Sequence, residues 1–449
     1  MKKVTVILPL HNSEKYIREC IDSIINQTLQ EIEIICIDSG SDGTSDIINS
    51  YAESDKRIQY LYDSNSSYGY KINKGIALSQ GTYVAIVESD DYIRSDMLQI
   101  LFEVAEKSQV DFIKADYKKF IDINGRRIET DVKHLVDQSL YNRVINIQEV
   151  PEINNHTGYS IWAGLYRKEF LISNNLYLNE TPGASYQDTG FSILVNLLSN
   201  KVYYIDCQLY RYRIDNSDSS VKSQNKYRCI IDEFSWIKEQ MQLRNINKEK
   251  YIYLYNNKKL MSYFWNYQRL SPEYQKKFLE EIHEDVEEFF NNDIFMKSLS
   301  PQQIDEVKIL HGDERAINKF KQNSLDIQNN IQQTAAIFKT KDEIVIFGAG
   351  KYGEVLIELN HILNQNNIVS ICDNDTSKHN FKLSNLAVKN PFETVLEHKN
   401  AFFVIANKRN GKEILSQLVE YGISHNSIYI SEKLAGKTAL LEAVLELPE

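Results

Sequence analysis

Proline, glycine and cysteine are all scarce in this chain. Its 449 residues include 7 Pro, 17 Gly and 5 Cys. So few Pro and Gly residues exclude a collagen-like or linker-rich protein. The cysteines are odd in number and contain no C-x-x-C pair, so they indicate neither a disulfide framework nor a zinc site. We therefore expect a globular protein with reduced cysteines, as in the cytoplasm.

The sequence also lacks long apolar runs and an excess of positive charge. No stretch approaches the roughly 18 apolar residues of a membrane-spanning helix. The opening MKKVTVILPLHN has too short an apolar stretch for a signal peptide and no small-residue cleavage site, so we interpret it as a first strand. A formal net charge of -11 disfavours nucleic-acid and anionic-membrane binding. We expect a small-molecule partner, no nucleic acid, and at most peripheral association with the inner face of a membrane.

Strands and helices alternate through the first half of the chain. The apolar segments VTVIL, IEIICI, RIQYLY and TYVAIV are separated by stretches whose apolar residues have helical spacing. Such continuously apolar strands predict a parallel sheet covered on both faces by helices. Ligands of these sheets bind beyond the carboxyl ends of the strands. Polar clusters follow these ends: Leu10 to Asn12, Asp38 to Thr44, and the acids Glu88, Asp90 and Asp91.

Three motifs occur in a fixed order within this region: PLHN, IDSGSDGTSD and YGYKINKGIALSQGTYVAIVESDDYI. The ordered set resembles the nucleotide-sugar half of family 2 glycosyltransferases, which have the GT-A fold. The resemblance implies a Rossmann-like nucleotide-sugar domain. It also implies that the acids, as a D-x-D-type signature, hold Mn²⁺ or Mg²⁺, which bridges the donor diphosphate.

The resemblance implies a role for each polar cluster. Asp90 is the expected metal ligand. Glu88 stands where Asp is usual and reaches one methylene further, so we expect it at the ribose or the sugar. The other residues expected to bind the nucleotide sugar at these strand ends are Pro9, Asn12, Ser89 and Asp91. The alternative is that the acids cap the helix beginning near Ser95 or sit solvated in a turn.

Asp38 matches the carboxylate that accepts a hydrogen bond from uracil in the family, which makes a UDP-sugar the expected donor. Its alternative is an Asx-turn opening a Gly-rich loop. In GYKIN, Gly69 permits a close backbone approach, and Lys71 and Asn73 resemble residues that face the nucleotide. Lys71 could equally be a solvated surface charge.

The segments SIWAGLYRKEFL and TPGASYQDTGFSILVNLL resemble the acceptor half of the same enzymes. Many relatives carry a Glu-Asp pair at the head of the second segment, with the Asp as general base, and here the pair is Gln187-Asp188. A base is needed because a sugar hydroxyl is a poor nucleophile near neutral pH, and attack opposite the departing diphosphate inverts the configuration. The alternative for Asp188 is a helix N-cap.

A further segment, LYRYRIDNSDSSVKS at 209–223, resembles the loop that closes over the diphosphate. Arg213 is the expected phosphate ligand, since a guanidinium pairs with two phosphate oxygens. Arg213 could equally be an ordinary surface charge. The resemblance ends near residue 225.

The second half of the chain differs from the first half in composition and in motifs. Residues 226–340 are rich in Lys, Glu, Gln and Asn and predict a helical connector. DEIVIFGAGKYGEVLIELN then gives a strand, a Gly-x-Gly-x-x-Gly turn and a helix, and a second strand ends at Asp373. This pattern is typical of dinucleotide-binding Rossmann domains. Because the remaining chain suffices for only half of such a fold, a structural or oligomerising module is the preferred interpretation.

The predicted fold class is α/β. It comprises a GT-A domain over residues 1–225, the helical connector over 226–340, a small Rossmann-like domain over 341–435 and a C-terminal helix over 436–449. The predicted function is inverting, metal-dependent transfer of a sugar to a hydroxyl of a bacterial surface glycan, lipid-linked glycan or glycoprotein. Two alternatives stay open: an NAD-dependent sugar oxidoreductase, and a non-catalytic glycan-assembly protein whose acids are unused.

Overall fold

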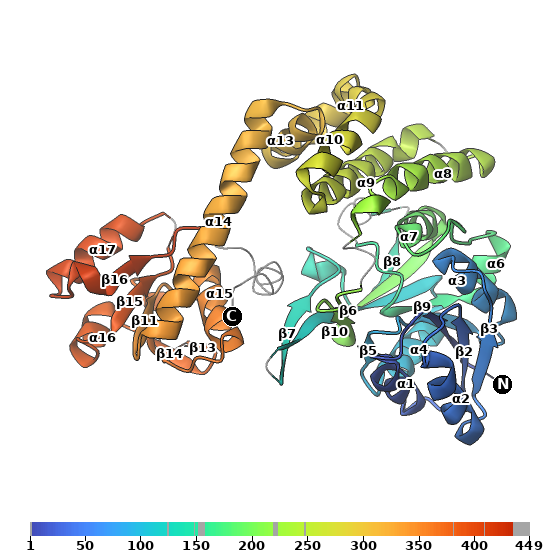
Figure 1. Cartoon of the computed structure of the whole chain (residues 1–449), viewed down its shortest axis with the longest axis horizontal. Helices are drawn as coiled ribbons and strands as arrows, with labels where there is room; N and C mark the ends of the chain where they lie inside the picture. The colour runs from blue at the N-terminus through green and yellow to red at the C-terminus, as the bar shows by residue number, and fades with distance from the viewer. Residues whose placement is uncertain are drawn as a thin grey trace. The chain divides into compact units, whose positions relative to one another are not determined.

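The computed structural model describes residues 2–123, 125–147, 149–150, 158–218, 223–246, 248–379, 381–407 and 409–433. The chain divides into two compact units (Figure 1). The first comprises Met1–Lys119 with Asp131–Ala316, and the second comprises Phe120–Thr130 with Ile317–Glu449. The predicted helix at 436–449 lies outside the described residues, and the predicted domain boundaries stay predictions.

The first unit is built on a mixed sheet whose first half is parallel. Its strands lie in the order β3-β2-β1-β4, and every residue of β1, β2 and β4 is buried. The parallel sheet predicted from the apolar segments is therefore confirmed. The bounds are β1 (Val4–Leu10), α1 (Ile17–Ile25), β2 (Ile32–Asp38), α2 (Thr44–Ser54), β3 (Ile58–Tyr62), α3 (Tyr68–Leu78), β4 (Tyr83–Ile86) and α4 (Met97–Ser108).

Antiparallel strands extend this sheet beyond β4. β9 pairs antiparallel with β4 and with β6, and β10 pairs antiparallel with β5 and β8. The described residues of this sheet form ten strands. The bounds are β5 (Tyr92–Ile93), β6 (Phe112–Ile123), β7 (Arg126–Val132), β8 (Val144–Asn146), β9 (Gly164–Arg167), α6 (Lys168–Ser173), α7 (Gln187–Leu198) and β10 (Lys201–Arg213).

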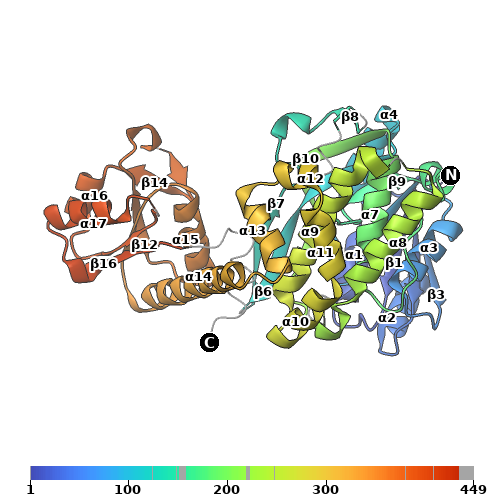
Figure 2. The same ribbon diagram turned by 90° about the horizontal axis from the view of Figure 1, so that it is seen from above.

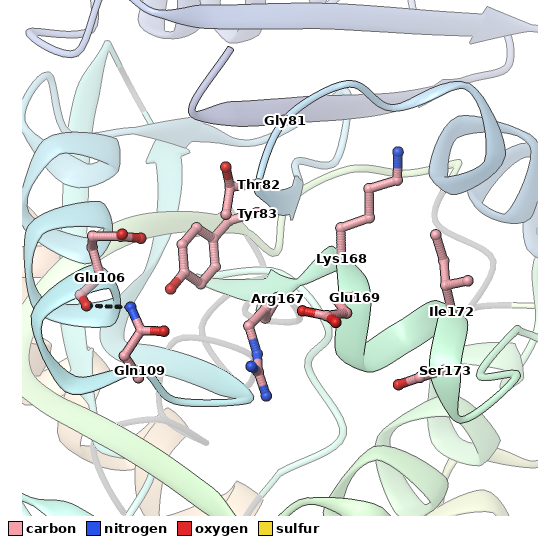
Figure 3. Close-up of a pocket in the computed structure, with 10 residues that line it drawn as sticks. All are labelled: Gly81, Thr82, Tyr83, Glu106, Gln109, Arg167, Lys168, Glu169, Ile172 and Ser173. Carbon is pink, nitrogen blue, oxygen red and sulfur yellow. Dashed lines mark hydrogen bonds between the residues drawn. The ribbon is translucent and has the colours of Figure 1, made fainter. Parts of the chain in front are cut away.

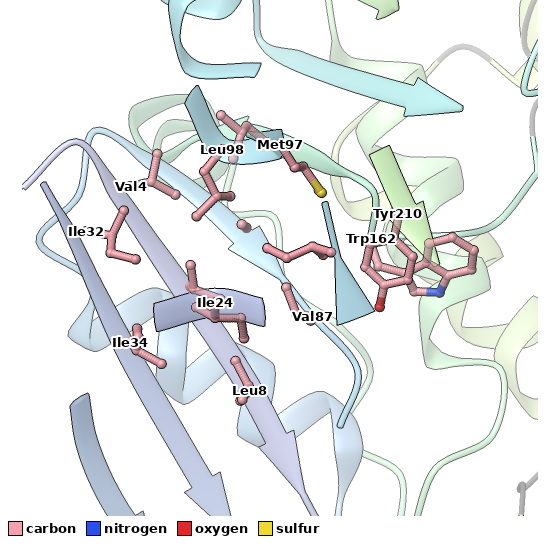
Figure 4. Packing of buried hydrophobic residues seen from close by; sticks show 14 of the residues in the cluster. Val4, Leu8, Ile24, Ile32, Ile34, Val87, Met97, Leu98, Trp162 and Tyr210 are labelled. Atoms are coloured by element: carbon pink, nitrogen blue, oxygen red, sulfur yellow. The ribbon is translucent and has the colours of Figure 1, made fainter. Parts of the chain in front are cut away.

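One apolar core fixes the sheet against its helices. Alternate residues of β1, such as Val4 and Leu8, point to the same face of the sheet, where they pack with Ile24 of α1 and Leu98 of α4 (Figure 4). At the far edge of this core, the Trp162 ring stacks on that of Tyr210, with centroids 4.6 Å apart. The same packing therefore spans both the parallel and the antiparallel strands.

Helices make up most of the described residues between 229 and 340, in agreement with the predicted helical segment. Their bounds are α8 (Cys229–Leu243), α9 (Lys248–Arg269), α10 (Pro272–Glu281), α11 (His283–Phe290), α12 (Asp293–Ser298), α13 (Pro301–Leu310) and α14 (Glu314–Thr340). Aromatic residues join these helices, since the Tyr263 ring lies 5.8 Å from Phe234 and 5.6 Å from Phe278. Nowhere in the described part of the chain does a helix combine the length and apolarity that crossing a bilayer requires.

The second unit contains a smaller sheet in the order β13-β14-β12-β11-β15-β16. All its neighbouring strands pair in parallel except β13 and β14. The second half of α14 lies against this sheet and bonds to its last strand through Asn330 and Tyr429 (Figure 2). The bounds are β11 (Ile344–Phe347), α15 (Lys351–Ile362), β12 (Ile368–Cys372), β13 (Lys382–Leu383), β14 (Leu386–Lys389), α16 (Pro391–Glu397), β15 (Phe402–Ile405), α17 (Gly411–Glu420) and β16 (Ile428–Ile430).

Candidate active site

The polar clusters predicted from the sequence lie at the carboxyl ends of β1, β2 and β4. Asp38 ends β2, opposite Leu10 at the end of β1. Its carboxylate is buried, and it accepts hydrogen bonds from the Gly40 amide at 2.7 Å and the Tyr60 hydroxyl at 3.0 Å. Burial and the Asp38 charge raise the pKa of Tyr60 to about 12. The Asx-turn to Gly40 is present, and each carboxylate oxygen keeps a second lone pair for a ligand.

The loop after β1 is fastened to the loop after β2. Pro9 is buried within β1 beside Ile37. Asn12 has a positive φ of 50°, which Asn tolerates better than most residues, and its side-chain oxygen accepts from the Ser41 amide at 2.9 Å. Ser41 follows Gly40, where an added Cβ would lie 2.6 Å from the Asn12 nitrogen. The two loops therefore approach each other directly beside Asp38.

Lys71 brings a buried ammonium to the same strand ends. Its Nζ donates to the Leu10 carbonyl at 2.8 Å and to the Ser39 hydroxyl at 3.0 Å. Burial lowers the pKa of Lys71, while the charges of Asp38 and Glu88 act to raise it. The alternative of a solvated surface lysine is therefore wrong, because the side chain is only 3% exposed.

Asn73 lies two residues further along α3, about half a helical turn from Lys71, and it is fully engaged elsewhere. Its amide nitrogen donates to the Leu178 carbonyl and to Glu180 Oε1, both at 2.9 Å, and its oxygen accepts from the Leu178 amide. Gly69 allows this approach, since an added Cβ would lie 1.9 Å from the Asn179 carbonyl oxygen. In the structure Asn73 therefore joins the nucleotide half to the acceptor half, and its nucleotide contact stays a prediction.

The acids after β4 each have a different partner. Glu88 accepts from the Tyr68 hydroxyl at 2.5 Å, and burial raises its pKa to about 8, with contributions from the Asp90 and Asp188 charges. Asp90 Oδ2 accepts from Asn216 Nδ2 at 2.8 Å. Burial also raises the pKa of Asp90.

Asp91 is the most enclosed of the three acids. It accepts from the Tyr210 hydroxyl and from the Arg213 amide, both at 2.7 Å, and so ties the end of β10 beside β5. The neighbouring Ser89 shares a hydrogen bond of 2.8 Å with the Ser13 hydroxyl. No side-chain cap is found on α4 in the described residues, and that helix follows Asp96. The alternative in which the acids cap α4 is therefore wrong. Asp91 is only 1% exposed and so is not solvated, whereas Glu88 and Asp90 are partly exposed.

Arg213 is buried rather than an ordinary surface charge. Its Nε donates to the Asp90 carbonyl at 2.9 Å, and its other nitrogens pair with Glu19 at 2.8 Å and Asp215 at 3.3 Å. The guanidinium also stacks over the Tyr16 ring at 4.5 Å. These contacts fix the backbone of Asp90, and the predicted phosphate contact of Arg213 stays a prediction.

Asp188 enters the site from the first turn of α7. The N-cap of this helix is Tyr186, not Asp188, and Tyr186 has a positive φ of 67°. Asp188 Oδ1 accepts from the Thr189 amide at 2.9 Å, and burial raises the pKa of Asp188 to about 6. Because its charge also raises the pKa of Glu88, the two carboxylates belong to one electrostatic environment.

Gln187 fixes the loop that presents Asp188. Its Nε2 donates to Thr181 Oγ1 at 2.9 Å and to the Gly183 carbonyl at 3.1 Å. Gly183 in turn accepts from the Tyr68 amide at 2.9 Å. These hydrogen bonds link the loop at 181–183 to helix α7 and to Tyr68 in the nucleotide half. Gln187 thus has a structural role, and Asp188 supplies the carboxylate of the Gln187-Asp188 pair.

The residues fit a divalent cation at Asp90. Asp90 Oδ1 has no hydrogen-bond partner among the described residues, so it can bind an ion without breaking a contact. One carboxylate is a sufficient protein ligand when substrate phosphates and water complete the shell, as is usual for Mg²⁺. A positive ion at Asp90 would also favour the ionised forms of the neighbouring carboxyl groups, whose pKa values are raised.

Three supporting residues could not be found from the sequence motifs alone. Tyr68, Tyr210 and Asn216 orient Glu88, Asp91 and Asp90 respectively. Tyr68 lies inside the YGYKIN motif, which was the one available signal. Tyr210 and Asn216 depend on how β10 folds back to β5.

A cavity of about 490 Å³ lies elsewhere in the first unit. It is lined by Gly81, Thr82, Tyr83, Glu106, Gln109, Arg167, Lys168, Glu169, Ile172 and Ser173 (Figure 3). Of these, Gly81, Thr82 and Tyr83 mark the amino end of β4, whereas the acids follow its carboxyl end. The cavity is therefore separate from the candidate site.

Known proteins resemble the first half of this chain. Residues 5–169 match the family model Glycosyl transferase family 2. The chain is 32% identical over 242 residues to Glycosyltransferase GlyA of Streptococcus pneumoniae serotype 4, which covers 52% of this chain and 34% of that protein. It is 33% identical over 236 residues to Uncharacterized glycosyltransferase EpsJ of Bacillus subtilis strain 168, which covers 51% of this chain and 65% of that protein. The chain thus spans less than two thirds of either relative.

The crystal structure of S. aureus TarS 1-349 in complex with UDP-GlcNAc is similar to this fold, with a TM-score of 0.50 at 20% identity. The likeness covers 63% of this chain and 80% of that chain. At this identity it bears on the fold alone, and it agrees with the predicted α/β class and a GT-A-like sheet. Residues 5–169 of this chain are therefore similar to family 2 glycosyltransferases, within an α/β fold that has a GT-A-like sheet.

Proposed function

We propose that the protein transfers a sugar from a nucleotide sugar, with UDP as the nucleotide, to an acceptor hydroxyl. The observation that carries this proposal is the convergence of Asp38, Asp90 and Asp188 on one site within a family 2 glycosyltransferase fold. Asp38 ends β2 and Asp90 follows β4, on either side of β1 in the sheet, and the charges of Asp90 and Asp188 both act on Glu88.

The donor half of the site binds the nucleotide and its diphosphate. Asp38 accepts the uracil N–H, and the loops of Asn12 and Gly40 enclose the base and ribose. The Lys71 ammonium supplies positive charge at the strand ends, where the diphosphate is expected. Asp90 would hold Mn²⁺ or Mg²⁺, which supplies charge that offsets the negative charge of the departing diphosphate.

The acceptor half supplies the base. A carboxylate with a pKa of about 6 is ionised at neutral pH and is still basic enough to take a proton from an attacking hydroxyl. Asp188 therefore receives the acceptor proton as the oxygen attacks the anomeric carbon. The attack comes from the side opposite the diphosphate, and the product has inverted configuration. The acceptor class we propose is a bacterial surface glycan, lipid-linked glycan or glycoprotein.

The second unit does not favour the NAD-dependent alternative. Asp373 would have to accept the ribose hydroxyls of a dinucleotide. Its Oδ2 already accepts two hydrogen bonds, from the Ala349 amide at 2.8 Å and from Lys378 Nζ at 2.9 Å, so both lone pairs of that oxygen are used. Only Oδ1, which accepts from the Asp375 amide at 2.9 Å, keeps a lone pair. We propose that this unit is a Rossmann-like module with a structural or oligomerising role.

A ligand panel on the full chain tests the proposal. UDP, GDP and NADH are each added with and without Mn²⁺, and the melting temperature is measured. We expect UDP with Mn²⁺ to raise it most, and UDP-sugars to release UDP slowly. A rise with NADH and none with any nucleoside diphosphate would contradict the proposed function.

A further inference from the structure

Three side chains that can bind a metal ion, those of His283, Glu287 and His311, lie close together in the helical segment. They are far along the chain from the acids after β4. His283 is the first residue of α11, and Glu287 lies four residues later, which places both on one face of that helix. His311 directly follows the last residue of α13. α11 and α13 pack against each other, with Val286 and Phe289 buried on the first helix.

The three side chains have the spacing of a metal site. One ligand atom from each lies within 4.8 Å of the others. His311 Nε2 and Glu287 Oε1 are 2.8 Å apart, and the two imidazole centroids are 5.9 Å apart. The His311 ring also packs edge-on against Phe290, with centroids 4.8 Å apart. That contact restricts the orientation of the His311 ring.

A simple His–Glu pair explains only part of this arrangement. Such a pair needs His311 and Glu287 alone. His283 turns toward them without making a hydrogen bond or ion pair to any described residue. Within the described part of the chain, no other set of three His, Cys, Asp or Glu side chains converges in this way.

The ligand chemistry selects the class of ion. Two imidazole nitrogens and one carboxylate oxygen suit Zn²⁺ and related late first-row dications, whereas Mg²⁺ prefers oxygen ligands. The side chains of His311 and Glu287 are 39% and 43% exposed, so an ion can enter from solvent and keep a water ligand. α11 also carries Glu284 and Glu288, whose negative charge favours a dication.

We propose that His283, Glu287 and His311 form a Zn²⁺-type binding site that links α11 to the end of α13. The site is chemically distinct from the oxygen ligand at Asp90 and does not depend on the sugar-transfer proposal. Binding cross-links two helices that the unfolded chain does not hold together, so the ion stabilises the folded segment.

Zinc titration of the full chain tests the site. The protein, without a histidine tag and freed of metal by chelation, is titrated with Zn²⁺ by calorimetry. We expect about one equivalent to bind and the melting temperature to rise. Co²⁺ should give the visible absorption bands of a nitrogen-ligated, low-coordinate ion.

Matched variants identify the ligands. His283→Gln and His311→Gln should each weaken Zn²⁺ binding at least about tenfold and remove the Co²⁺ bands. His361→Gln on α15 should leave both unchanged. Because His283 and His311 are exposed, the variants should melt like the metal-free wild type. Stoichiometric binding that survives both histidine substitutions, or no stoichiometric binding by the wild type, would overturn the proposal.

Discussion

At the scale of single residues, we expect Asp90 and Asp91 to have different roles, Asp90 in metal binding and Asp91 in stability. Among the described residues, one carboxylate oxygen of Asp90 has no hydrogen-bond partner, whereas both oxygens of Asp91 accept hydrogen bonds from β10. We expect Asp90→Asn to abolish UDP release from a UDP-sugar, to weaken UDP binding only when Mn²⁺ is present, and to leave stability nearly unchanged. Calorimetric titration with and without Mn²⁺ measures the effect. Equal UDP affinity of the wild type in both conditions would contradict a metal at Asp90.

Asp91→Ala should behave in the opposite way. The substitution leaves the Tyr210 hydroxyl and the Arg213 amide without their acceptor inside the protein. Losses of this kind cost about 2 to 4 kcal/mol of unfolding free energy. Urea unfolding measures this change, and a variant as stable as the wild type would show that the two bonds matter little.

The raised pKa of Asp188 predicts how the turnover rate falls at low pH. Its pKa is raised to about 6 by burial, so the ionised base is lost as the pH falls through that value. With saturating donor, the turnover rate should be level near pH 7 and should fall about tenfold per pH unit well below pH 6. Steady-state rates between pH 4.5 and 7.5 test this. A rate at pH 5 equal to that at pH 7 would show that no such base limits turnover.

The positions of these acids could be predicted from the sequence, but their hydrogen-bond partners could not. Asp38, Asp90 and Asp188 could be located because a motif and the end of an apolar strand or the head of a helix are local features. Their partners are distant in the chain: Tyr210 is 119 residues from Asp91, and Asn216 is 126 residues from Asp90. Side chains that meet only through tertiary folding leave no spacing to find in one sequence.

At the scale of elements, the contact between α3 and residues 178–180 connects the donor and acceptor halves. An added Cβ at Gly69 would lie 1.9 Å from a backbone oxygen of Asn179, and backbone cannot move aside cheaply. We expect Gly69→Ala to cost about 1 to 3 kcal/mol of stability and to weaken UDP binding by displacing α3 and Lys71.

Gly158→Ala is the matched control, because no atom of the described part of the chain lies within 4 Å of its added Cβ. Urea unfolding and UDP titration of both variants measure the difference. If Gly69→Ala binds UDP and unfolds like Gly158→Ala, the approach of α3 to Asn179 does not support the site.

The pattern of elements was predictable only where it is local. β1 to β4 follow from apolar runs separated by amphipathic helices, because a parallel strand buried on both faces is apolar throughout. β6 and β10 mix buried and exposed positions, and their pairing with β9 and β5 joins distant segments. The antiparallel half of the sheet therefore could not be ordered from periodicity.

At the scale of the whole molecule, the two units should be separable in function. Gly353 of the second unit allows a tight turn, since an added Cβ would lie 2.1 Å from the Gly348 carbonyl oxygen. Gly353→Ala should therefore destabilise the second unit. UDP-sugar turnover should stay within about threefold of the wild type, because the proposed site lies in the first unit. Turnover measured beside thermal unfolding checks this, and loss of turnover in a protein that still binds UDP would assign the second unit a part in catalysis.

We propose that this chain is a glycosyltransferase in which Asp188 is the base. The most direct measurement compares donor binding and turnover in Asp188→Asn. Asn can still bond the first turn of α7 and removes only the charge and basicity, so UDP-sugar affinity measured by calorimetry should be nearly unchanged. UDP release should fall by about 100- to 10,000-fold, the usual contribution of a general base. A variant that binds donor normally and turns it over within about threefold of the wild type would contradict the account.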